Sequence, residues 1–326
     1  MARWFRIGDL ELLVVSDGVM RQDAGAVFGL VPRVMWERYV TELDEKYRMQ
    51  MGLNSLLVRA SGKTILVDTG IGTKGSAAPG AISTEGSGKL VENLAREGIR
   101  PEDIDIVVNT HLHFDHAGGN TLRLPLRSAS GRSGQAALVE GRPVPAFPRA
   151  RYFIQKGEWE AATHTNERTR GTYLAENIEP LDDARQVELV EGEVELAPGV
   201  RIMPAPGHTE DHCIVELESG GDYAVYVGEL AQHPVMLERL AWISAFDVLP
   251  LVSLETKRRF TEKAIEKNAT LISVHASYPG LGRLRADDGR RRWEEIRENG
   301  AGSFFVAPTS TSSPRAPQND RPRGRP

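Results

Sequence analysis

The sequence has 326 residues, of which 40% are hydrophobic and 26% charged, and its formal net charge is −5. These proportions are typical of a globular protein with enough apolar material for a real core. The acidic balance, without a basic stretch that interleaves with aromatic residues, argues against a nucleic-acid-binding protein. The single cysteine, Cys213, excludes an internal disulfide framework and suits a reducing compartment.

The N-terminal residues lack the features of a secretory signal peptide. Arg6 and Asp9 interrupt any apolar run there, whereas a signal peptide needs an unbroken apolar stretch before its cleavage site. No segment approaches the roughly 20 apolar residues that a membrane-spanning helix requires. We therefore expect a cytoplasmic protein that binds neither a membrane nor nucleic acid.

Short apolar runs between turn residues predict a series of strands along the chain. The first lies at residues 10–15 and ends in a turn at 16–18, and a hairpin follows at 55–60 and 64–67. A continuous apolar run at 104–109 has the β-branched bias of a buried strand. Further strands are expected at residues 152–154, 187–196, 200–203, 213–217, 223–227 and 271–274.

Helices are predicted between these strands. Leu90, Val91 and Leu94 recur at helical spacing before Gly98, which predicts a helix at 89–97. Other helices are expected near residues 35–42, 157–164, 169–178, 254–267 and 290–298. The remaining long segments predict an irregular arm or lid at 19–50 and loops at 70–88 and 121–149.

The order of these elements predicts an α/β fold. Strands gather early and late in the chain with helices between them, which favours two packed sheets with helices outside. We expect one domain over residues 1–306. Residues 307–326 contain almost no apolar side chains and predict a disordered tail.

The densest cluster of reactive side chains follows the strand predicted at 104–109. Alternate residues of a strand point the same way, so His111 and His113 are expected to face one point. Asp115 and His116 fall on the turn that follows, where small residues let the backbone curl tightly. Three imidazoles and one carboxylate at this spacing are ligands that Zn²⁺, Mn²⁺ or Fe²⁺ accept. The cluster therefore predicts a metal site.

The run from His111 to His116 resembles the HxHxDH signature of the metallo-β-lactamase superfamily. Other landmarks of that family follow its order: Asp68 after an early strand, His208 in a Pro-Gly-His-Thr loop, Glu229 after Gly228, and His275 after a late strand. The resemblance covers roughly residues 10 to 280. Residues 25–32 and 166–169 resemble a branch near methyl parathion hydrolase and the acyl-homoserine lactone lactonases.

The resemblance implies a fold and a set of roles. The fold is a four-layer αββα sandwich of two mixed β-sheets. His111, His113 and His208 would hold one divalent metal, Asp115, His116 and His275 a second, and Glu229 would bridge them. Asp115 would also orient a metal-bound hydroxide and carry its proton as the catalytic residue. Asp68 would fix the orientation of a ligand from behind.

Glu229 departs from the family pattern, which usually has an aspartate there. Its extra methylene extends the reach of the carboxylate. Glu229 would still bridge the metals after a small backbone adjustment, or would leave one metal weakly held. We expect a retained site, because the other six ligand positions are filled and carboxylates bind singly or bidentately.

Several other residues lie near the predicted site. His212 is interpreted as a hydrogen-bonded loop histidine, and Cys213 as a small buried hydrophobic residue. His233 is expected either to line the pocket or to lie on an exposed loop. Phe28, Trp36 and Trp242 are candidates for the wall of a substrate pocket, although core packing explains them equally well.

The function expected from this resemblance is hydrolysis of a small ester, lactone, amide or phosphotriester by two metal ions, with Zn²⁺ expected and Mn²⁺ or Fe²⁺ acceptable. One alternative is an iron-dependent redox member of the same fold. Another is a non-catalytic ligand-binding relative with an altered metal site, which the departure at Glu229 would favour. An exposed apolar arm at residues 26–36 is consistent with a homodimer.

Overall fold

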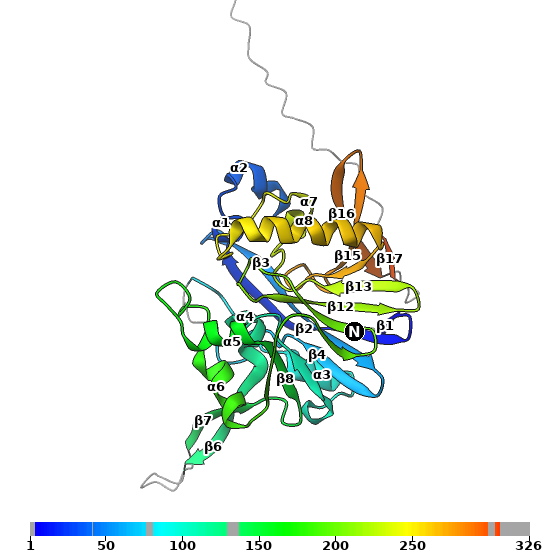
Figure 1. Ribbon diagram of the computed structural model, residues 1–326. Helices are drawn as coiled ribbons and strands as arrows, with labels where there is room; N and C mark the ends of the chain where they lie inside the picture. Colours follow the sequence, from blue (N-terminus) through cyan, green and yellow to red (C-terminus); the bar gives the residue numbers. More distant parts are fainter. Residues whose placement is uncertain (1–3, 41, 76–80, 129–136, 299–303, 307–326) are drawn as a thin grey trace, which may run out of the picture.

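The computed structural model describes residues 4–40, 42–75, 81–128, 137–298 and 304–306. Within them, two mixed β-sheets pack face to face, with helices on their outer faces (Figure 1). This is the predicted α/β sandwich. The disordered tail predicted at 307–326 lies outside the described residues.

The first sheet has seven strands, in the order β1-β2-β3-β4-β5-β8-β9. Their bounds are β1 (Trp4–Ile7), β2 (Leu10–Asp23), β3 (Arg48–Ala60), β4 (Lys63–Val67), β5 (Ile106–Val108), β8 (Arg151–Gln155) and β9 (Val187–Val190). The strands from β1 to β4 pair antiparallel, whereas β4, β5, β8 and β9 pair in parallel. The carboxyl ends of β4 and β5 therefore meet at one edge, which is where such sheets bind ligands.

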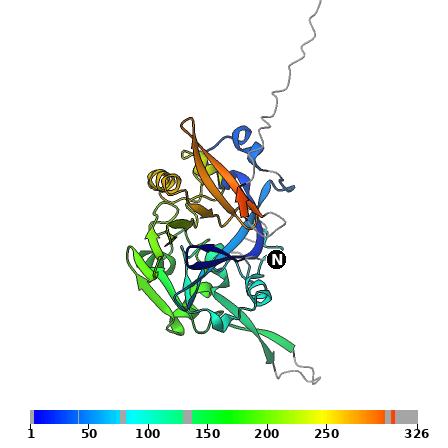
Figure 2. The same cartoon turned by 90° about the vertical axis from the view of Figure 1, so that its right-hand side faces the viewer.

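The second sheet has eight strands, in the order β10 to β17. Their bounds are β10 (Val194–Ala197), β11 (Val200–Pro204), β12 (Cys213–Ser219), β13 (Asp222–Tyr226), β14 (Thr270–Ile272), β15 (Leu281–Asp287), β16 (Arg290–Glu298) and β17 (Phe304–Val306). Only the β13–β14 pairing is parallel among these described strands. A separate hairpin of β6 (Thr121–Ser128) and β7 (Ala137–Pro145) extends from the body of the molecule (Figure 2).

Both faces of the central strands are buried at residues 65–67 of β4 and throughout β5, which explains why these residues are continuously apolar. Leu12 of β2 packs with Tyr226 of the second sheet in the core between the two sheets. Its neighbour Leu13 points the other way and packs with Leu90 of α3 (Leu90–Arg96). The helices α5 (Lys156–Thr163) and α6 (Ala175–Asp183) also cover this outer face.

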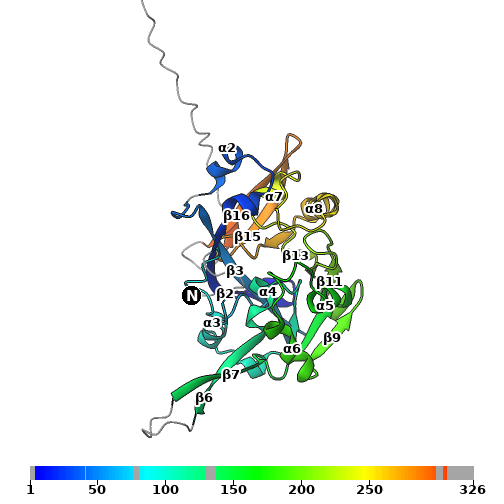
Figure 3. The same ribbon diagram turned by 90° about the vertical axis from the view of Figure 1, so that its left-hand side faces the viewer.

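The outer face of the second sheet is covered by α8 (Pro250–Glu266), as Figure 1 shows. Phe260 of α8 packs with Val225 of β13 in a core that also includes α1 (Ala24–Phe28) and α7 (Val235–Glu238). Figure 3 shows the segment containing α2 (Arg33–Trp36) near α7 on this side. No helix in the described ranges has the length and apolar character needed to cross a membrane.

The arm predicted at residues 19–50 is shorter and more ordered than expected. β2 continues to Asp23 and β3 begins at Arg48, so both ends of this range belong to the first sheet. The turn predicted at 16–18 is instead a bulge within β2, where Gly18 adopts φ +111°. The helix predicted at 35–42 is reduced to α2 and a short 3₁₀ turn, η1 (Glu37–Tyr39).

The helix predicted at 290–298 is wrong, because these residues form β16. Asp288 and Gly289 adopt φ +46° and +71°, as in the tight turns that join two antiparallel strands. The turn folds β16 back on β15, with Trp293 opposite Leu284. The Arg- and Glu-rich composition indicated a helix, but this turn decides the structure.

Three further predictions differ from the structure. The strand predicted at 187–196 divides at Gly192 (φ +72°), with β9 in one sheet and β10 in the other. The helix predicted at 169–178 begins only at Ala175. The loop predicted at 121–149 contains the β6–β7 hairpin, although residues 129–136 lie outside the described part.

Candidate metal centre

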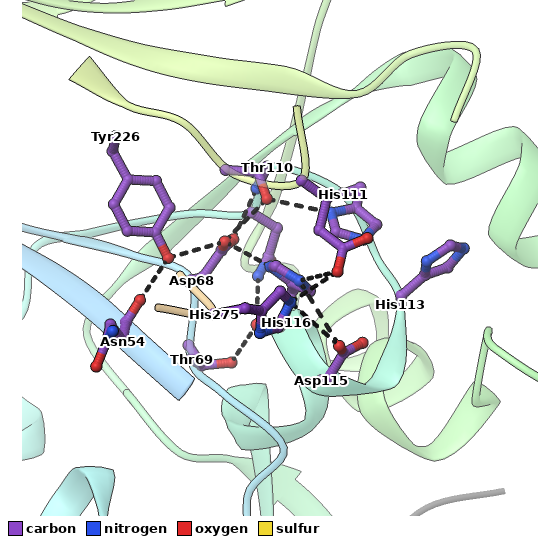
Figure 4. Close-up of polar contacts among 12 residues, drawn as sticks. Asn54, Asp68, Thr69, Thr110, His111, His113, Asp115, His116, Tyr226 and His275 are labelled. Atoms are coloured by element: carbon purple, nitrogen blue, oxygen red, sulfur yellow. Dashed lines mark hydrogen bonds and ion pairs between the residues drawn. The ribbon is translucent and has the colours of Figure 1, made fainter. Parts of the chain in front are cut away.

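The predicted cluster lies at the carboxyl end of β5. His111, His113, Asp115 and His116 are all buried, with exposed fractions of 0 to 7%. His113 immediately precedes the short helix α4 (Phe114–Ala117), whose first turn carries Asp115 and His116. Figure 4 shows these side chains together at the end of the sheet. Burial of so many polar groups is costly unless each has a partner.

The seven side chains named from the sequence form two groups. The first consists of His111, His113 and His208, and the second of Asp115, His116, Glu229 and His275. Within each group, the candidate ligand atoms lie within 4.8 Å of one another. The structure therefore brings together residues that are more than 160 positions apart in the sequence.

Glu229 connects the two groups through its two carboxylate oxygens. Oε2 lies 2.7 Å from Nε2 of His208, in the first group. Oε1 lies 2.7 Å from Nε2 of His275 and 3.7 Å from Nε2 of His116, in the second. The longer side chain therefore reaches both groups from its present backbone position, as a bridging carboxylate must.

The donor set fits divalent metal ions. Nε2 of His111 and Nε2 of His116 are buried without a hydrogen-bond partner among the described residues, as expected for atoms that bind a cation. Burial and the neighbouring imidazoles hold the pKa of His111 well below its ordinary value, so its ring is neutral, as metal binding requires. Imidazole and carboxylate ligands suit Zn²⁺, Mn²⁺ and Fe²⁺.

Asp68 lies behind His116, as predicted for a residue that orients a ligand. Its Oδ2 is 2.8 Å from Nδ1 of His116 and accepts hydrogen bonds from the hydroxyls of Thr110 and Tyr226. The backbone N–H of Thr110 donates to Oδ1 at 2.8 Å. Figure 4 shows Asp68 at the centre of these contacts. They direct Nε2 of His116 toward the second group.

Asp247 plays the same part behind His208 and was missed by the sequence analysis. Its Oδ1 lies 3.1 Å from Nδ1 of His208, and its Oδ2 accepts a hydrogen bond from the Ser253 hydroxyl. Although burial opposes a positive charge, the carboxylates of Glu229 and Asp247 raise the pKa of His208 to about 10. No motif marks Asp247, because it lies 39 residues beyond His208.

We expect Asp247→Ala to weaken metal binding by about 10- to 100-fold, the usual cost of losing such a partner of a ligand. The His208 ring would lose the hydrogen bond that fixes its orientation. Metal dissociation constants measured by competition with a chelator check this, with Asp182→Asn on the exposed face of α6 as the control. Equal affinities for Asp247→Ala and the wild type would contradict it.

Glu158 of α5 is a second residue that the sequence did not reveal. Its Oε1 accepts hydrogen bonds from the backbone N–H of Leu112 at 2.8 Å and from the Tyr173 hydroxyl at 2.9 Å. Its Oε2 accepts one from the Thr209 hydroxyl at 2.6 Å. Glu158 thus ties the loop of His111 and His113 to the loop of His208.

His212 is a hydrogen-bonded loop histidine, which confirms its interpretation. One ring nitrogen, Nδ1, lies 2.9 Å from the carbonyl oxygen of Ala205. The other, Nε2, accepts a hydrogen bond from the backbone N–H of Glu229 at 2.9 Å. Gly228 adopts φ +52°, and a Cβ at this position would press on the His212 ring. His212 therefore holds the backbone of Glu229 in place.

A cavity of about 360 Å³ opens beside the two groups. Its lining includes His113, Asp115, His208 and Glu229. Most other lining residues come from 168–172 and 245–248: Arg168, Thr169, Gly171, Thr172, Ala245, Phe246 and Val248. The arm predicted at 19–50 contributes Gln22 and the loop predicted at 70–88 contributes Ile82, whereas the described part of 121–149 contributes none.

The aromatic residues proposed for the pocket wall do not line this cavity. Phe28 and Trp36 stack at 5.0 Å in the core, and Trp242 packs edge-on against Phe28. Trp242 lines a neighbouring groove on the arm side instead. His233 lies 5.6 Å from Phe28 and lines a different cavity, behind His275. The aromatic side chains at the metal cavity are Phe114 and Phe246.

Comparison with known sequences agrees with this geometry. The family model described as "Metallo-beta-lactamase superfamily" matches residues 50–276. An N-acyl homoserine lactonase of Bacillus cereus is 33% identical over 171 residues, which is 48% of this chain and 55% of that protein. The chain thus matches about half the length of this curated relative.

Two solved structures have the same architecture. One, a probable metal-dependent hydrolase from Staphylococcus aureus, has a TM-score of 0.74 and 25% identity over 90% of this chain and 99% of its own. The other, a dizinc quorum-quenching lactonase in complex with its product, has a TM-score of 0.73 and 20% identity over 91% and 98%. Because the family model matches more than half of the sequence, the chain belongs to the metallo-β-lactamase superfamily.

Proposed function

We propose that this chain is a dinuclear metal-dependent hydrolase of a small ester, lactone, amide or phosphotriester, with residues 1–306 as its catalytic unit. The observation that carries the proposal is the position of Glu229, whose two oxygens each lie 2.7 Å from a histidine of a different group. This position supports two adjacent metal ions rather than one. It also weakens the alternative of a binding protein whose second site is lost.

The ligands of the first ion would be His111, His113, His208 and Glu229, and those of the second Asp115, His116, Glu229 and His275. Zn²⁺ is our choice of metal, because imidazole and carboxylate suit it and a structural neighbour is a dizinc protein. When bound, the two ions would supply a water of lowered pKa and polarise the oxygen of the scissile carbonyl or phosphoryl group.

Asp115 is the residue that we propose for proton transfer. Its carboxylate lines the cavity, and Oδ2 lies 3.6 Å from Nε2 of His275. Burial raises the pKa of Asp115, which favours a group that accepts the proton of the attacking water and returns it to the leaving group. Asp115 would therefore act both as the proton acceptor of the reaction and as a ligand of the second metal.

The cavity supports a small substrate of mixed polarity. Phe114, Phe246 and Val248 offer apolar surface, while Arg168 and Thr169 offer hydrogen-bond donors. Such a lining suits an acyl or aryl ester whose apolar part contacts the phenyl rings. Lactones come first among the candidates, because the curated relative and one structural neighbour are lactonases.

The test is a substrate panel on the zinc-loaded protein. The panel contains N-hexanoyl-L-homoserine lactone, p-nitrophenyl butyrate, a p-nitroanilide and methyl parathion, and a chelated sample is its matched blank. We expect metal-dependent turnover of at least one ester or lactone. A protein that binds two metals and hydrolyses none of these compounds would refute the proposed activity. Iron in the purified protein, together with thiol-dependent oxygen uptake, would instead support the redox alternative.

We also propose that the chain forms a homodimer through the arm. Leu30, Val34 and Leu251 are 101%, 77% and 76% exposed, and a groove of about 720 Å³ lies between the arm and the start of α8. In a two-fold dimer the same surface of each copy meets the other. The exposed apolar side chains of one copy would then enter the groove of its partner, so a second copy is the occupant that covers both features.

The expected result is a particle of twice the 35.9 kDa chain mass in light scattering coupled to size exclusion. Leu30→Glu together with Leu251→Glu should give a monomer, because two buried charges would face the partner. The control is Leu189→Glu, an exposed leucine far from the arm on β9. A wild-type monomer at micromolar concentration would refute the dimer.

We further propose that the chain works in the cytoplasm. Cys213 is buried as a free thiol, which a reducing compartment preserves. Cell fractionation with an antibody against the chain tests this location. Recovery outside the cytoplasmic fraction would contradict it.

A further inference from the structure

The turn that carries Glu229 also carries Gln232, a buried amide that the proposed chemistry does not use. Nε2 of Gln232 donates a hydrogen bond to Oε2 of Glu229 at 2.9 Å. Both side chains are buried, with exposed fractions of 3% and 5%. Gln232 thus contacts the same oxygen that lies 2.7 Å from His208.

The orientation of the Gln232 amide is fixed from its other side. The Ser244 hydroxyl donates a hydrogen bond to Oε1 of Gln232 at 2.8 Å. The same hydroxyl oxygen accepts a hydrogen bond from the backbone N–H of Phe246 at 3.1 Å. Every donor in this series of hydrogen bonds points toward the carboxylate. A rotated amide would present its oxygen to the Glu229 carboxylate and lose the hydrogen bond to Oε2.

Glu229 needs such a restraint if it is to serve both groups. A glutamate side chain has three rotatable bonds, and the backbone of Glu229 is anchored through its N–H, which donates to His212. Nothing in the His275 contact holds Oε2 toward the first group, because that contact uses Oε1. Among the described contacts of Oε2, Gln232 offers the one donor that is not itself a candidate metal ligand.

We propose that Gln232, oriented by Ser244, is a positioning residue that keeps Oε2 of Glu229 facing the group of His111, His113 and His208. The proposal rests on the two-metal site of the proposed function. Gln232 would thereby decide how tightly the ion of this first group is held. The effect passes through Glu229, so it must disappear when the side chain at this position no longer reaches Gln232.

The experiment is a double-mutant cycle that measures metal rather than activity. Gln232→Leu, Glu229→Asp and the combined variant are purified metal-free and reloaded with Zn²⁺. Stoichiometry is read by elemental analysis, and the two dissociation constants by chelator competition. With Glu229 intact, Gln232→Leu should weaken one of the two sites by about 10- to 100-fold, as for other partners of metal ligands. In the Glu229→Asp background, where the carboxylate is one carbon shorter, the same change should have less than about threefold effect.

Gln22→Leu is the matched control. Gln22 lines the same cavity but belongs to neither group of candidate ligands. Its replacement should leave both dissociation constants unchanged. Ser244→Ala should reproduce part of the Gln232→Leu effect, because it frees the amide without removing it. If Gln232→Leu fails to fold, Gln232→Met takes its place in the cycle.

Two results would overturn the proposal. The first is that both dissociation constants are unchanged in Gln232→Leu. The second is an equal fall in both backgrounds, which would mean that Gln232 acts through the fold or the cavity instead of through Glu229. These outcomes are separate from the proposed function, since a wild-type chain that binds two metals without hydrolysing any ester refutes that function and leaves the cycle interpretable.

Discussion

Chelation of the bound metal should lower the melting temperature of this protein by about 10 °C, and Zn²⁺ should restore it. A ligand at about 1,000 times its dissociation constant stabilises the folded state by roughly 4 kcal/mol. At roughly 2–4 °C per kcal/mol for domains of similar size, this gives a shift of that order. Chelation would also leave Nε2 of His111 and Nε2 of His116 buried with no hydrogen-bond partner among the described residues, which is itself unfavourable.

The measurement is thermal unfolding of chelated, zinc-loaded and magnesium-treated samples. Mg²⁺ should not restore the lost stability, because it prefers oxygen ligands and dehydrates reluctantly. His116→Ala should reduce the zinc-dependent shift by more than half, whereas His164→Ala should retain all of it, because His164 is exposed and outside both groups. The same melting temperature with and without metal would contradict a buried dinuclear centre.

Four of the seven candidate ligands could be predicted from the residues themselves, because their signal is local. His111, His113, Asp115 and His116 lie within six residues, so their convergence required only the alternation of a strand and one tight turn. His208, Glu229 and His275 lie far from this cluster in the sequence. They were expected only from the order of landmarks in the metallo-β-lactamase superfamily, because no local pattern ties them to the cluster.

The residues that support the centre could not be predicted in the same way. Asp247, Gln232 and Glu158 act through hydrogen bonds to partners whose positions depend on how loops pack, and their own neighbours in the sequence form no pattern. Each is one carboxylate or amide among many. Only the folded arrangement of α5 and of residues 229–248 around the centre distinguishes them.

The errors in the fold have a similar origin. The nine residues of β16 are mostly Arg and Glu, which have weak β-propensity and fit a helix by composition. The decisive signal was the Asp288-Gly289 turn, which commits the following residues to pair with β15. Gly192 divides two strands between the two sheets by the same kind of backbone preference. Turn residues therefore outweighed composition at both places.

Asp115→Asn should reduce kcat for whichever ester or lactone the panel identifies by about 10²- to 10⁴-fold, the usual contribution of a positioned acid–base group. Asparagine keeps the shape and one oxygen of the side chain but cannot accept the proton of the attacking water. His116, Glu229 and His275 remain in the second group, so metal content should stay close to two per chain. KM should change by no more than a few fold, because the loss falls on the transition state.

The kcat value, KM and metal stoichiometry must be measured on the same preparation, so that loss of metal is not mistaken for loss of the proton acceptor. Asp182→Asn on α6 is the control, since Asp182 is exposed and should leave all three quantities unchanged. A fall in kcat that accompanies loss of one metal would assign Asp115 to metal binding alone. An unchanged kcat with two metals bound would remove Asp115 from proton transfer and leave water activation to the cations themselves. The buried carboxylate of Asp115 would then serve only as a metal ligand.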